Sequence, residues 1–365
     1  MSLTLAAVAC AALLSSACTS GGTTAGTHAS TSPRVHGRLL ISSSSGNDVA
    51  VVNLPTVRAI PMQRPVGTTY LAALQWGPDG TPWEFTPLSN VGSPALFSLS
   101  TTRPAQRLAP PIRGDFFQIA GGRLMAAACG GFVTVAGLRE LSSPSTWQRL
   151  PTGASRSCGA ALSPDGRRVA YPTLTGTGDR IVELPADGAG APRELVSLGD
   201  LDALAAAGIR RPVVGSNIVW GRGGIAFLAK PRSVLNGQAN QAPHALVVIP
   251  PAGAPLVVAL GKVDSGEVLW QPRGDLVAFT DDVGFGNFGR TGSTAYTELR
   301  VFDPRSQTMR QIGTASGYAS GLFAWASDGS AIAWGQTNDF IRFLTPSGGS
   351  LGALPIEGVP FDWAT

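Results

Sequence analysis

The chain has few lysines, histidines and cysteines, and its basic residues form no run. Of its 365 residues, 27 are lysine or arginine, but only Lys230 and Lys262 are lysine. The other 25 (27 − 2) are arginines scattered along the sequence, and the formal net charge is only +4. Because a nucleic-acid-binding protein presents a clustered basic stripe, the sequence argues against a nucleic-acid partner.

Sequence patterns for metal binding and catalysis are also missing. The three histidines, His28, His36 and His244, lack the spacing of zinc ligands. Asp281 and Asp282 are adjacent, but no D-x-D-x-D calcium loop accompanies them. Residues 317–321, Gly-Tyr-Ala-Ser-Gly, place their serine one position late for the G-x-S-x-G nucleophile elbow of a hydrolase. We therefore predict no metal, no cofactor and no catalytic residues, and a protein that is not an enzyme.

Residues 284–289 do spell G-x-G-x-x-G, the pattern of a dinucleotide-binding loop. Such a loop must open a helix whose N-terminus holds the pyrophosphate. Here a strand-like sequence, RTGSTAYTELRVF, follows instead. The pattern therefore indicates a glycine-rich loop between two strands.

The N-terminal apolar run is too short to cross a bilayer. Leu3–Leu14 has twelve residues, whereas a transmembrane helix needs about 20, so the run is typical of a signal peptide. The next residues, Leu14-Ser15-Ser16-Ala17-Cys18, resemble a bacterial lipobox, although Ser15 stands where that family prefers Leu. The resemblance implies cleavage before Cys18 and lipidation of its thiol. Alternatives are cleavage at Cys10, or cleavage after Ala17 without lipidation.

A flexible tether is expected after the cleavage site. Residues 19–33 are nearly all Ser, Thr, Gly and Ala, which cannot bury a core. We therefore predict a signal peptide over 1–17, a tether over 18–34 and one folded domain over 35–365. The resemblance to lipoproteins implies anchoring to the outer face of the bacterial cytoplasmic membrane, with a secreted or periplasmic protein as the alternative.

The folded domain has the composition of many short strands joined by tight turns. The chain contains 46 glycines and 28 prolines, as expected for many turns. Its hydrophobic residues, 44% of the total, are enough for a sizeable core. One pattern recurs: an apolar or tryptophan-containing stretch, a turn around glycine, and an alternating apolar strand. The turn glycines are Gly37, Gly80, Gly122, Gly166, Gly224, Gly274 and Gly329.

Each repeat continues with further strands, so that one unit makes a four-stranded propeller blade. The last segment, GVPFDWAT, matches a first strand with nothing after it, whereas the segment from Val35 begins at the turn. The strand around Trp363 should therefore complete the blade that starts near His36. The fold class we predict is an all-β, seven-bladed propeller closed in this way, and six blades is the alternative if the unit around Gly122 is degenerate.

The turn sequences GPDG, SPDG and ASDG, which end at Gly80, Gly166 and Gly329, resemble the TolB-like, WD40-like (PD40-type) propeller repeats of bacterial envelope proteins. The resemblance covers about 330 of the 365 residues and implies the fold, but no particular function. Residues 43–55 also resemble the repeats of YVTN-type propellers.

Two sets of residues are assigned structural roles. The tryptophans that share one repeat position should pack between blades, and Asp-Gly or an equivalent pair should form the turns; these residues are Trp76, Trp220, Trp270, Trp325, Trp363, Gly80, Gly166, Gly274 and Gly329. In an exported protein, the pair Cys129 and Cys158 indicates a disulfide, with two free thiols as the alternative.

Three functions fit these observations. The first is a monomeric binding module that holds an unidentified protein, peptide or other component of the envelope. The second is a propeller enzyme of the lactonase or lyase type with a site in the channel, and the third is a purely structural role.

A short helix in residues 197–209, capped by Ser197 or Asp200, should decorate one face of the ring.

Overall fold

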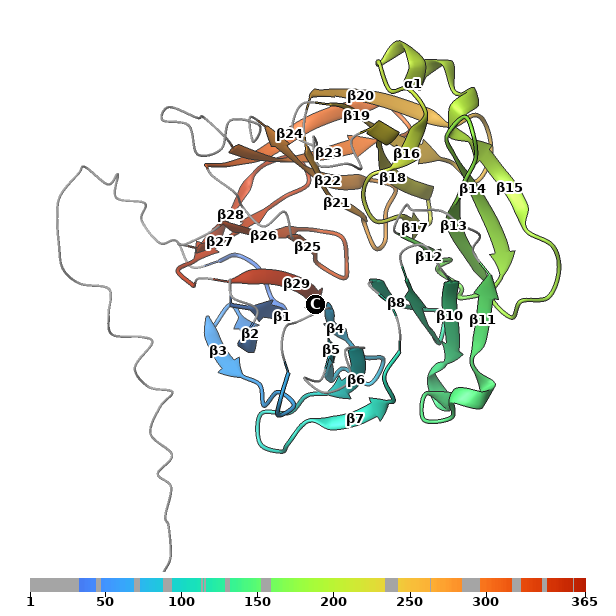
Figure 1. Ribbon diagram of the computed structural model, residues 1–365. Helices are drawn as coiled ribbons and strands as arrows, with labels where there is room; N and C mark the ends of the chain where they lie inside the picture. The colour runs from blue at the N-terminus through green and yellow to red at the C-terminus, as the bar shows by residue number, and fades with distance from the viewer. Residues whose placement is uncertain are drawn as a thin grey trace, which may run out of the picture. The chain divides into compact units, whose positions relative to one another are not determined.

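The computed structural model describes residues 33–43, 47–68, 73–87, 94–112, 114, 116–128, 132–151, 159–233, 242–262, 264–283, 296–316, 323–336, 340–356 and 358–365. Within these ranges, seven antiparallel sheets form a ring (Figure 1). The prediction of an all-β, seven-bladed propeller is confirmed. The six-bladed alternative is wrong, because the unit around Gly122 forms a complete four-stranded sheet.

The first four blades contain four strands each. Blade 1 consists of β29 (Val359–Ala364), β1 (Gly37–Ser42), β2 (Val49–Leu54) and β3 (Arg58–Pro61). Blade 2 consists of β4 (Ala73–Trp76), β5 (Pro82–Pro87), β6 (Pro94–Ser98) and β7 (Gln106–Ala109). Blade 3 consists of β8 (Phe116–Ala120), β9 (Arg123–Ala127), β10 (Phe132–Gly137) and β11 (Gln148–Pro151). Blade 4 consists of β12 (Ala161–Leu162), β13 (Arg168–Leu174), β14 (Asp179–Pro185) and β15 (Arg193–Ser197).

Blade 5 departs from the expected four strands, because two short strands share its first position and both pair with β18. It consists of β16 (Pro212–Val214), β17 (Val219–Gly221), β18 (Gly224–Pro231), β19 (Pro243–Ile249) and β20 (Leu256–Lys262). Blade 6 consists of β21 (Asp264–Trp270), β22 (Val277–Val283), β23 (Tyr296–Asp303) and β24 (Thr308–Ser316). Blade 7 consists of β25 (Phe323–Trp325), β26 (Ile332–Gln336), β27 (Phe340–Leu344) and β28 (Ser350–Leu354).

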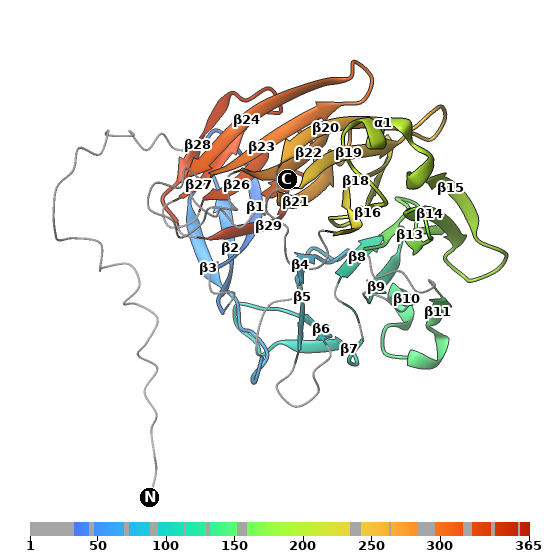
Figure 2. The same cartoon turned by 45° about the horizontal axis from the view of Figure 1, so that its top comes forward.

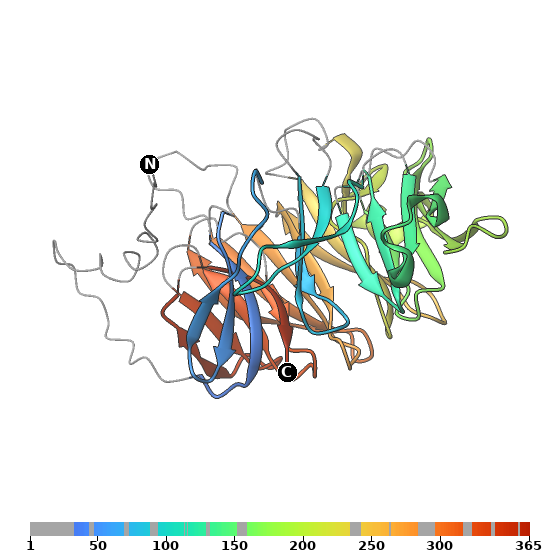
Figure 3. The same ribbon diagram turned by 90° about the horizontal axis from the view of Figure 1, so that it is seen from below.

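The C-terminal strand closes the ring. β29 pairs antiparallel with β1, with Trp363 opposite Leu39. From below, the red C-terminal strand and the blue strands of blade 1 lie side by side (Figure 3). The first strands of the blades, among them β29, β4 and β8, surround the centre of the ring (Figures 1 and 2). In the described part of the chain, closure lets each blade pack against a neighbour on both faces.

The core is divided among the junctions between blades. The described residues contain seven hydrophobic clusters, and each combines side chains from two neighbouring blades. Between blades 2 and 3, for example, the rings of Phe85 and Phe117 stack with centroids 4.1 Å apart. One twisted sheet cannot bury both of its faces alone, so the stability of each blade depends on its neighbours.

The aspartates of the predicted Asp-Gly turns act through their side chains. Of the two residues in each pair, the glycines Gly80, Gly166 and Gly329 adopt positive φ, at 74°, 71° and 78°. Asp165 instead accepts a hydrogen bond from the backbone N–H of Arg167 at 3.1 Å. Asp79 and Asp328 make the same bond two residues onward, so the aspartates form Asx-turns.

The insertion after β15 is helical, as predicted, but shorter. It consists of a 3₁₀ turn, η4 (Leu198–Asp200), and a single helical turn, α1 (Asp202–Ala206). Leu201 is the N-cap of α1, and no side chain caps either element, so the predicted caps are wrong. The helical segment is held by the burial of Leu198 and Leu204 against blades 4 and 5. Two more 3₁₀ turns, η2 (Leu138–Glu140) and η3 (Pro144–Thr146), lie between β10 and β11.

Among the described residues, no helix is long and apolar enough to span a membrane.

Candidate functional site

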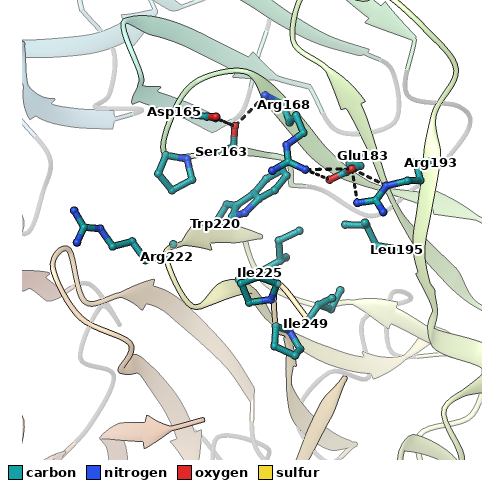
Figure 4. A pocket seen from close by; sticks show the side chains of 15 residues that line it. Ser163, Asp165, Arg168, Glu183, Arg193, Leu195, Trp220, Arg222, Ile225 and Ile249 are labelled. Atoms are coloured by element: carbon teal, nitrogen blue, oxygen red, sulfur yellow. Dashed lines mark hydrogen bonds and ion pairs between the residues drawn. The ribbon is translucent and has the colours of Figure 1, made fainter. Parts of the chain in front are cut away.

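A pocket of about 350 Å³ opens between blades 4 and 5 (Figure 4). Ligand pockets in proteins typically have volumes of about 300–1,000 Å³. Blade 4 and its turns contribute Ser163, Pro164, Asp165, Arg168, Glu183, Arg193 and Leu195. Blade 5 and its turns contribute Trp220, Gly221, Arg222, Gly224, Ile225, Ile249, Pro250 and Pro251. The pocket is therefore built from the β12–β13 turn, the outer strands of blade 4 and two turns of blade 5.

Glu183 fixes two guanidinium groups on the wall of the pocket. Its Oε1 accepts hydrogen bonds from Arg193 Nε at 2.7 Å and from Arg168 Nη1 at 3.4 Å, and its Oε2 lies 3.3 Å from Arg168 Nη1. The side chain of Glu183 is only 9% exposed, whereas those of Arg168 and Arg193 are 48% and 68% exposed. Two exposed cations are thus oriented by one buried carboxylate.

The β-sheet register places these three side chains together. Glu183 on β14 lies directly opposite Arg193 on β15. Arg168 begins β13 and reaches Glu183 from the other side, because β13 and β14 pair antiparallel. Charged pairs that face each other across adjacent strands stabilise a sheet by roughly 0.2–1 kcal/mol each.

Trp220 forms the floor beneath Arg168. The Arg168 guanidinium lies 5.3 Å from the centre of the indole ring, within the range of a cation–π interaction. Blades 1 and 2 repeat this arrangement, with Arg38 4.4 Å from the ring of Trp76. In both places an arginine just after the first turn of one blade covers the repeat tryptophan of the next blade.

The β12–β13 turn supplies a fixed hydroxyl and a fixed carboxylate. Ser163 Oγ donates to Asp165 Oδ1 at 2.6 Å and accepts from the backbone N–H of Arg168 at 2.9 Å. The hydrogen bond from Ser163, with that from the Arg167 N–H, holds the pKa of Asp165 below its ordinary value. The serine hydroxyl is buried and engaged within the turn, which does not leave it placed as a nucleophile next to a general base.

The charges of the pocket favour an anionic ligand. The lining residues include three arginines (Arg168, Arg193 and Arg222) and two carboxylates (Asp165 and Glu183), so the net formal charge is 3 − 2 = +1. The two carboxylates are already engaged, one by guanidinium groups and one by its own turn. The arrangement can therefore bind and orient an acid.

Polar side chains near the centre of the ring connect neighbouring blades. Gln118 Oε1 accepts from the backbone N–H of Leu162 at 2.7 Å. Asn217 Oδ1 accepts from the N–H of Val268 at 3.3 Å and its Nδ2 donates to the carbonyl of the same residue. The first strand of a blade has a free edge, and these side chains satisfy its backbone groups.

Glu267 on β21 makes a similar connection to blade 7. It accepts a hydrogen bond from the backbone N–H of Phe323. Burial raises its pKa from 4.5 to about 8, and no other described residue makes a hydrogen bond to its buried Oε2. The carboxyl is therefore largely protonated at neutral pH.

The structure places the tryptophans of the repeat between blades. Trp270, Trp325 and Trp363 are buried in the clusters that join blades 5 and 6, 6 and 7, and 7 and 1. Trp76 and Trp220 are partly buried against the clusters of blades 1 and 2 and of blades 4 and 5. Only Trp220 also lines the pocket.

The predicted turn glycines close their turns. The N–H groups of Gly80, Gly166 and Gly329 donate to the carbonyl three residues earlier at 2.8–2.9 Å, and that of Gly274 does so at 3.4 Å without a positive φ. Cys18, Cys129 and Cys158 lie outside the described residues, as does the G-x-G-x-x-G segment. Their predicted roles remain predictions.

Acidic residues and histidines do not gather into a metal-binding group anywhere in the described part of the chain. Asp281, considered at first for calcium, is buried and lies 3.2 Å from Arg300 Nε. An arginine beside the carboxylate provides the counter-charge that a cation would otherwise supply.

A comparison with a solved structure supports the fold. A candidate 6-phosphogluconolactonase from Bacteroides uniformis is similar to the chain with a TM-score of 0.50 and 13% identity, over 89% of this chain and 97% of that protein. The chain is a seven-bladed β-propeller. At this identity the similarity shows the fold alone. The fold is also consistent with the TolB-like repeat pattern of the turns.

Other propeller structures match more distantly. TolB from Acinetobacter baumannii has a TM-score of 0.43 and 10% identity, over 90% of this chain and 67% of that one. An oligogalacturonate lyase in complex with manganese has a TM-score of 0.48 and 11% identity, over 89% of this chain and 86% of that one. No family model matches the sequence, and no curated protein matches it either.

Sequence reasoning found one part of the pocket and missed the rest. The SPDG turn and Trp220 stood out because they belong to the repeat. Arg168, Glu183 and Arg193 come from three different strands, and only the register of the sheet brings them together. The available signal was the alternation of charge and apolar residues in RELVS and DRIVELP.

Proposed function

We propose that this protein is an extracytoplasmic, lipid-anchored binding module that holds an acidic partner or ligand of the cell envelope between blades 4 and 5. The observation that carries the proposal is the pocket in which Glu183 orients two exposed arginines beside an indole. Near the ring centre, the side chains of Gln118 and Asn217 are used in hydrogen bonds between blades, which supports binding rather than catalysis. The lipobox-like sequence at Cys18 and the tether after it support surface attachment.

The binding role is tested by cross-linking on intact cells. Cells that produce the wild-type protein, the R193Q variant or the R180Q variant are cross-linked, and the captured species are identified after purification. Arg180 is the matched control, because it is an exposed arginine of the same blade, paired with Glu194, that does not line the pocket. The proposal expects an envelope partner with the wild type and R180Q and its loss with R193Q. Equal capture by all three proteins would refute the assigned site.

Surface attachment is tested separately by cell fractionation of the wild type and C18S. One acyl chain binds a membrane only reversibly, but the two or three chains of a bacterial lipoprotein anchor a protein stably. The wild type should therefore remain with the membrane and C18S should be released. A wild-type protein found in the soluble extracytoplasmic fraction would favour plain secretion.

A second candidate function is a propeller enzyme of the lactonase or lyase type. Glu267 favours it, because a buried carboxyl with a pKa of about 8 is suited to act as a general acid. Sugar lactones are substrates to test, because the similar Bacteroides protein is described as a candidate 6-phosphogluconolactonase. Turnover of a lactone by the wild type and its loss in E267Q would support this candidate, and equal rates in both would reject Glu267 as its acid.

A further inference from the structure

The two walls of the pocket differ in character. The wall from blade 4 carries the guanidinium groups of Arg168 and Arg193 and the carboxylate between them (Figure 4). The wall from blade 5 is largely apolar, with Trp220, Ile225, Ile249 and two prolines, and Arg222 is its one charged lining residue. A ligand that fills the space must present a charged group to one side and apolar surface to the other.

The arginines retain hydrogen-bond donors for a ligand. Among the described residues, Arg193 uses Nε and Nη2 for Glu183, and Arg168 uses Nη1. Arg193 Nη1 and Arg168 Nη2 are therefore available, and an oriented guanidinium binds a carboxylate through short, charge-assisted hydrogen bonds. Because Glu183 is buried and holds both groups in place, little side-chain freedom is lost when a ligand binds.

We infer that the pocket binds an amphiphilic monocarboxylate. Its carboxylate lies against Arg168 and Arg193, and its apolar part contacts Trp220 and the wall of blade 5. One negative charge balances the net charge of +1 obtained from the lining residues, whereas a doubly charged phosphate would leave an excess negative charge beside Asp165. The inference rests on the proposed function and deepens it by naming the chemical class of the ligand.

Two sources can supply this chemistry: the C-terminus of a peptide with an apolar last residue, or a free small organic acid. The shared element is a carboxylate a few bonds away from an aromatic or aliphatic group. N-acetylphenylalanine has this element, and its primary amide has the same shape without the charge.

The test is isothermal titration calorimetry of the full chain with N-acetylphenylalanine and with its amide. The acid should bind saturably, and the amide at least about tenfold more weakly, since hydrogen bonds to charged groups are worth roughly that factor or more. R193Q should weaken binding of the acid to the level of the amide, and R180Q should bind like the wild type. Absence of acid binding, equal binding of acid and amide, or an unchanged affinity in R193Q would each overturn the inference.

R193Q is expected to fold, because the side chain of Arg193 is 68% exposed and Arg168 remains as the counter-charge of Glu183. A thermal melt of each variant verifies this. If R193Q does not fold, the affinities of the wild type for N-acetylphenylalanine and for its amide still decide whether the inference holds.

One further titration separates the two sources of the ligand. The tripeptide Ala-Ala-Phe with a free C-terminus should bind more tightly than N-acetylphenylalanine if a peptide terminus is the ligand, and no more tightly if the ligand is a small acid. Failure of the broader proposal would be seen differently: the acid would bind as expected, but cross-linking of cells would capture no partner. The ligand class would then stand without the envelope partner.

Discussion

Asp362 accepts a hydrogen bond from the backbone N–H of Trp76 at 2.8 Å, although 286 positions separate the two residues. The same carboxylate accepts from the N–H of Trp363 through its other oxygen. Asp362 belongs to the strand that closes blade 1, and Trp76 to the first strand of blade 2. The contact therefore couples ring closure to the next junction.

Removal of this carboxylate should weaken the ring. D362A leaves the partly buried backbone N–H of Trp76 without its acceptor, so the free energy of unfolding should fall by about 1–3 kcal/mol. D362N should lose less, because the amide oxygen can still accept from one of the two donors. Urea denaturation followed by tryptophan fluorescence measures both values. D200A, which changes an exposed aspartate of η4, is the control, and its free energy of unfolding should stay within about 0.5 kcal/mol of the wild-type value. A free energy of unfolding for D362A in that same range would contradict the role assigned to Asp362.

The stability of the protein should decrease as the pH rises through the titration of Glu267. Its pKa in the folded protein, about 8, lies above the ordinary value of 4.5. Its contribution is therefore fully present below about pH 4.5 and is lost as the pH rises through about 8. The loss is of order a few kcal/mol, since a tenfold change in proton affinity corresponds to about 1.4 kcal/mol.

E267Q should remove this pH dependence, because the amide cannot ionise and its oxygen can still accept from the N–H of Phe323. The free energy of unfolding is measured for the wild type and for E267Q at pH 5 and at pH 8. The stability of E267Q relative to the wild type should be greater at pH 8 than at pH 5. Burial also raises the pKa of Asp362, but this group is present in both proteins and cancels in the comparison. A constant difference between the two pH values would show that Glu267 does not titrate in this range.

Two adjacent glycines test the packing of blade 3 against blade 4. Gly121 and Gly122 both have positive φ, 53° and 75°, so alanine strains the backbone at either position. A Cβ at Gly121 would lie 2.1 Å from the carbonyl carbon of Asp165, whereas a Cβ at Gly122 would have nothing within 4 Å. G122A should cost about 1 kcal/mol and G121A about 1–3 kcal/mol more. Equal melting temperatures for the two variants would argue against this contact between turns.

The pair Cys129 and Cys158 should form a disulfide in the exported protein. A bridge that closes a loop of about 30 residues stabilises a protein by roughly 3–4 kcal/mol in the chain-entropy model. Peptide mapping by mass spectrometry without reduction should find the linked peptides, and reduction should lower the melting temperature. Quantitative alkylation of both cysteines without prior reduction would show free thiols instead.

The blades could be predicted from the sequence because their signals are local. The glycine of each turn and the tryptophan before it stand in one short segment, such as FAWASDG, so the unit can be recognised without knowing what it packs against. Ring closure was predicted because a first strand is left over at the C-terminal end and the blade at Val35 lacks one, and the pairing of Trp363 with Leu39 confirms it.

The pocket could not be predicted in the same way, because it depends on the register between strands. Glu183 and Arg193 face each other only because β14 and β15 pair with a bulge near residues 181 and 182. Trp220 reaches Arg168 only because neighbouring blades stack. The doubled first strand of blade 5 was missed for a similar reason, since β16 is three residues long and pairs with the far end of β18.

The location of the binding site can be measured most directly by hydrogen exchange of the full chain with and without its cross-linked partner. A binding site between blades 4 and 5 predicts slower exchange in residues 163–168, 193–195 and 220–225, which surround the pocket, and no change in β3 or β7. Protection confined to other blades, with these three segments unchanged, would contradict a binding site between blades 4 and 5.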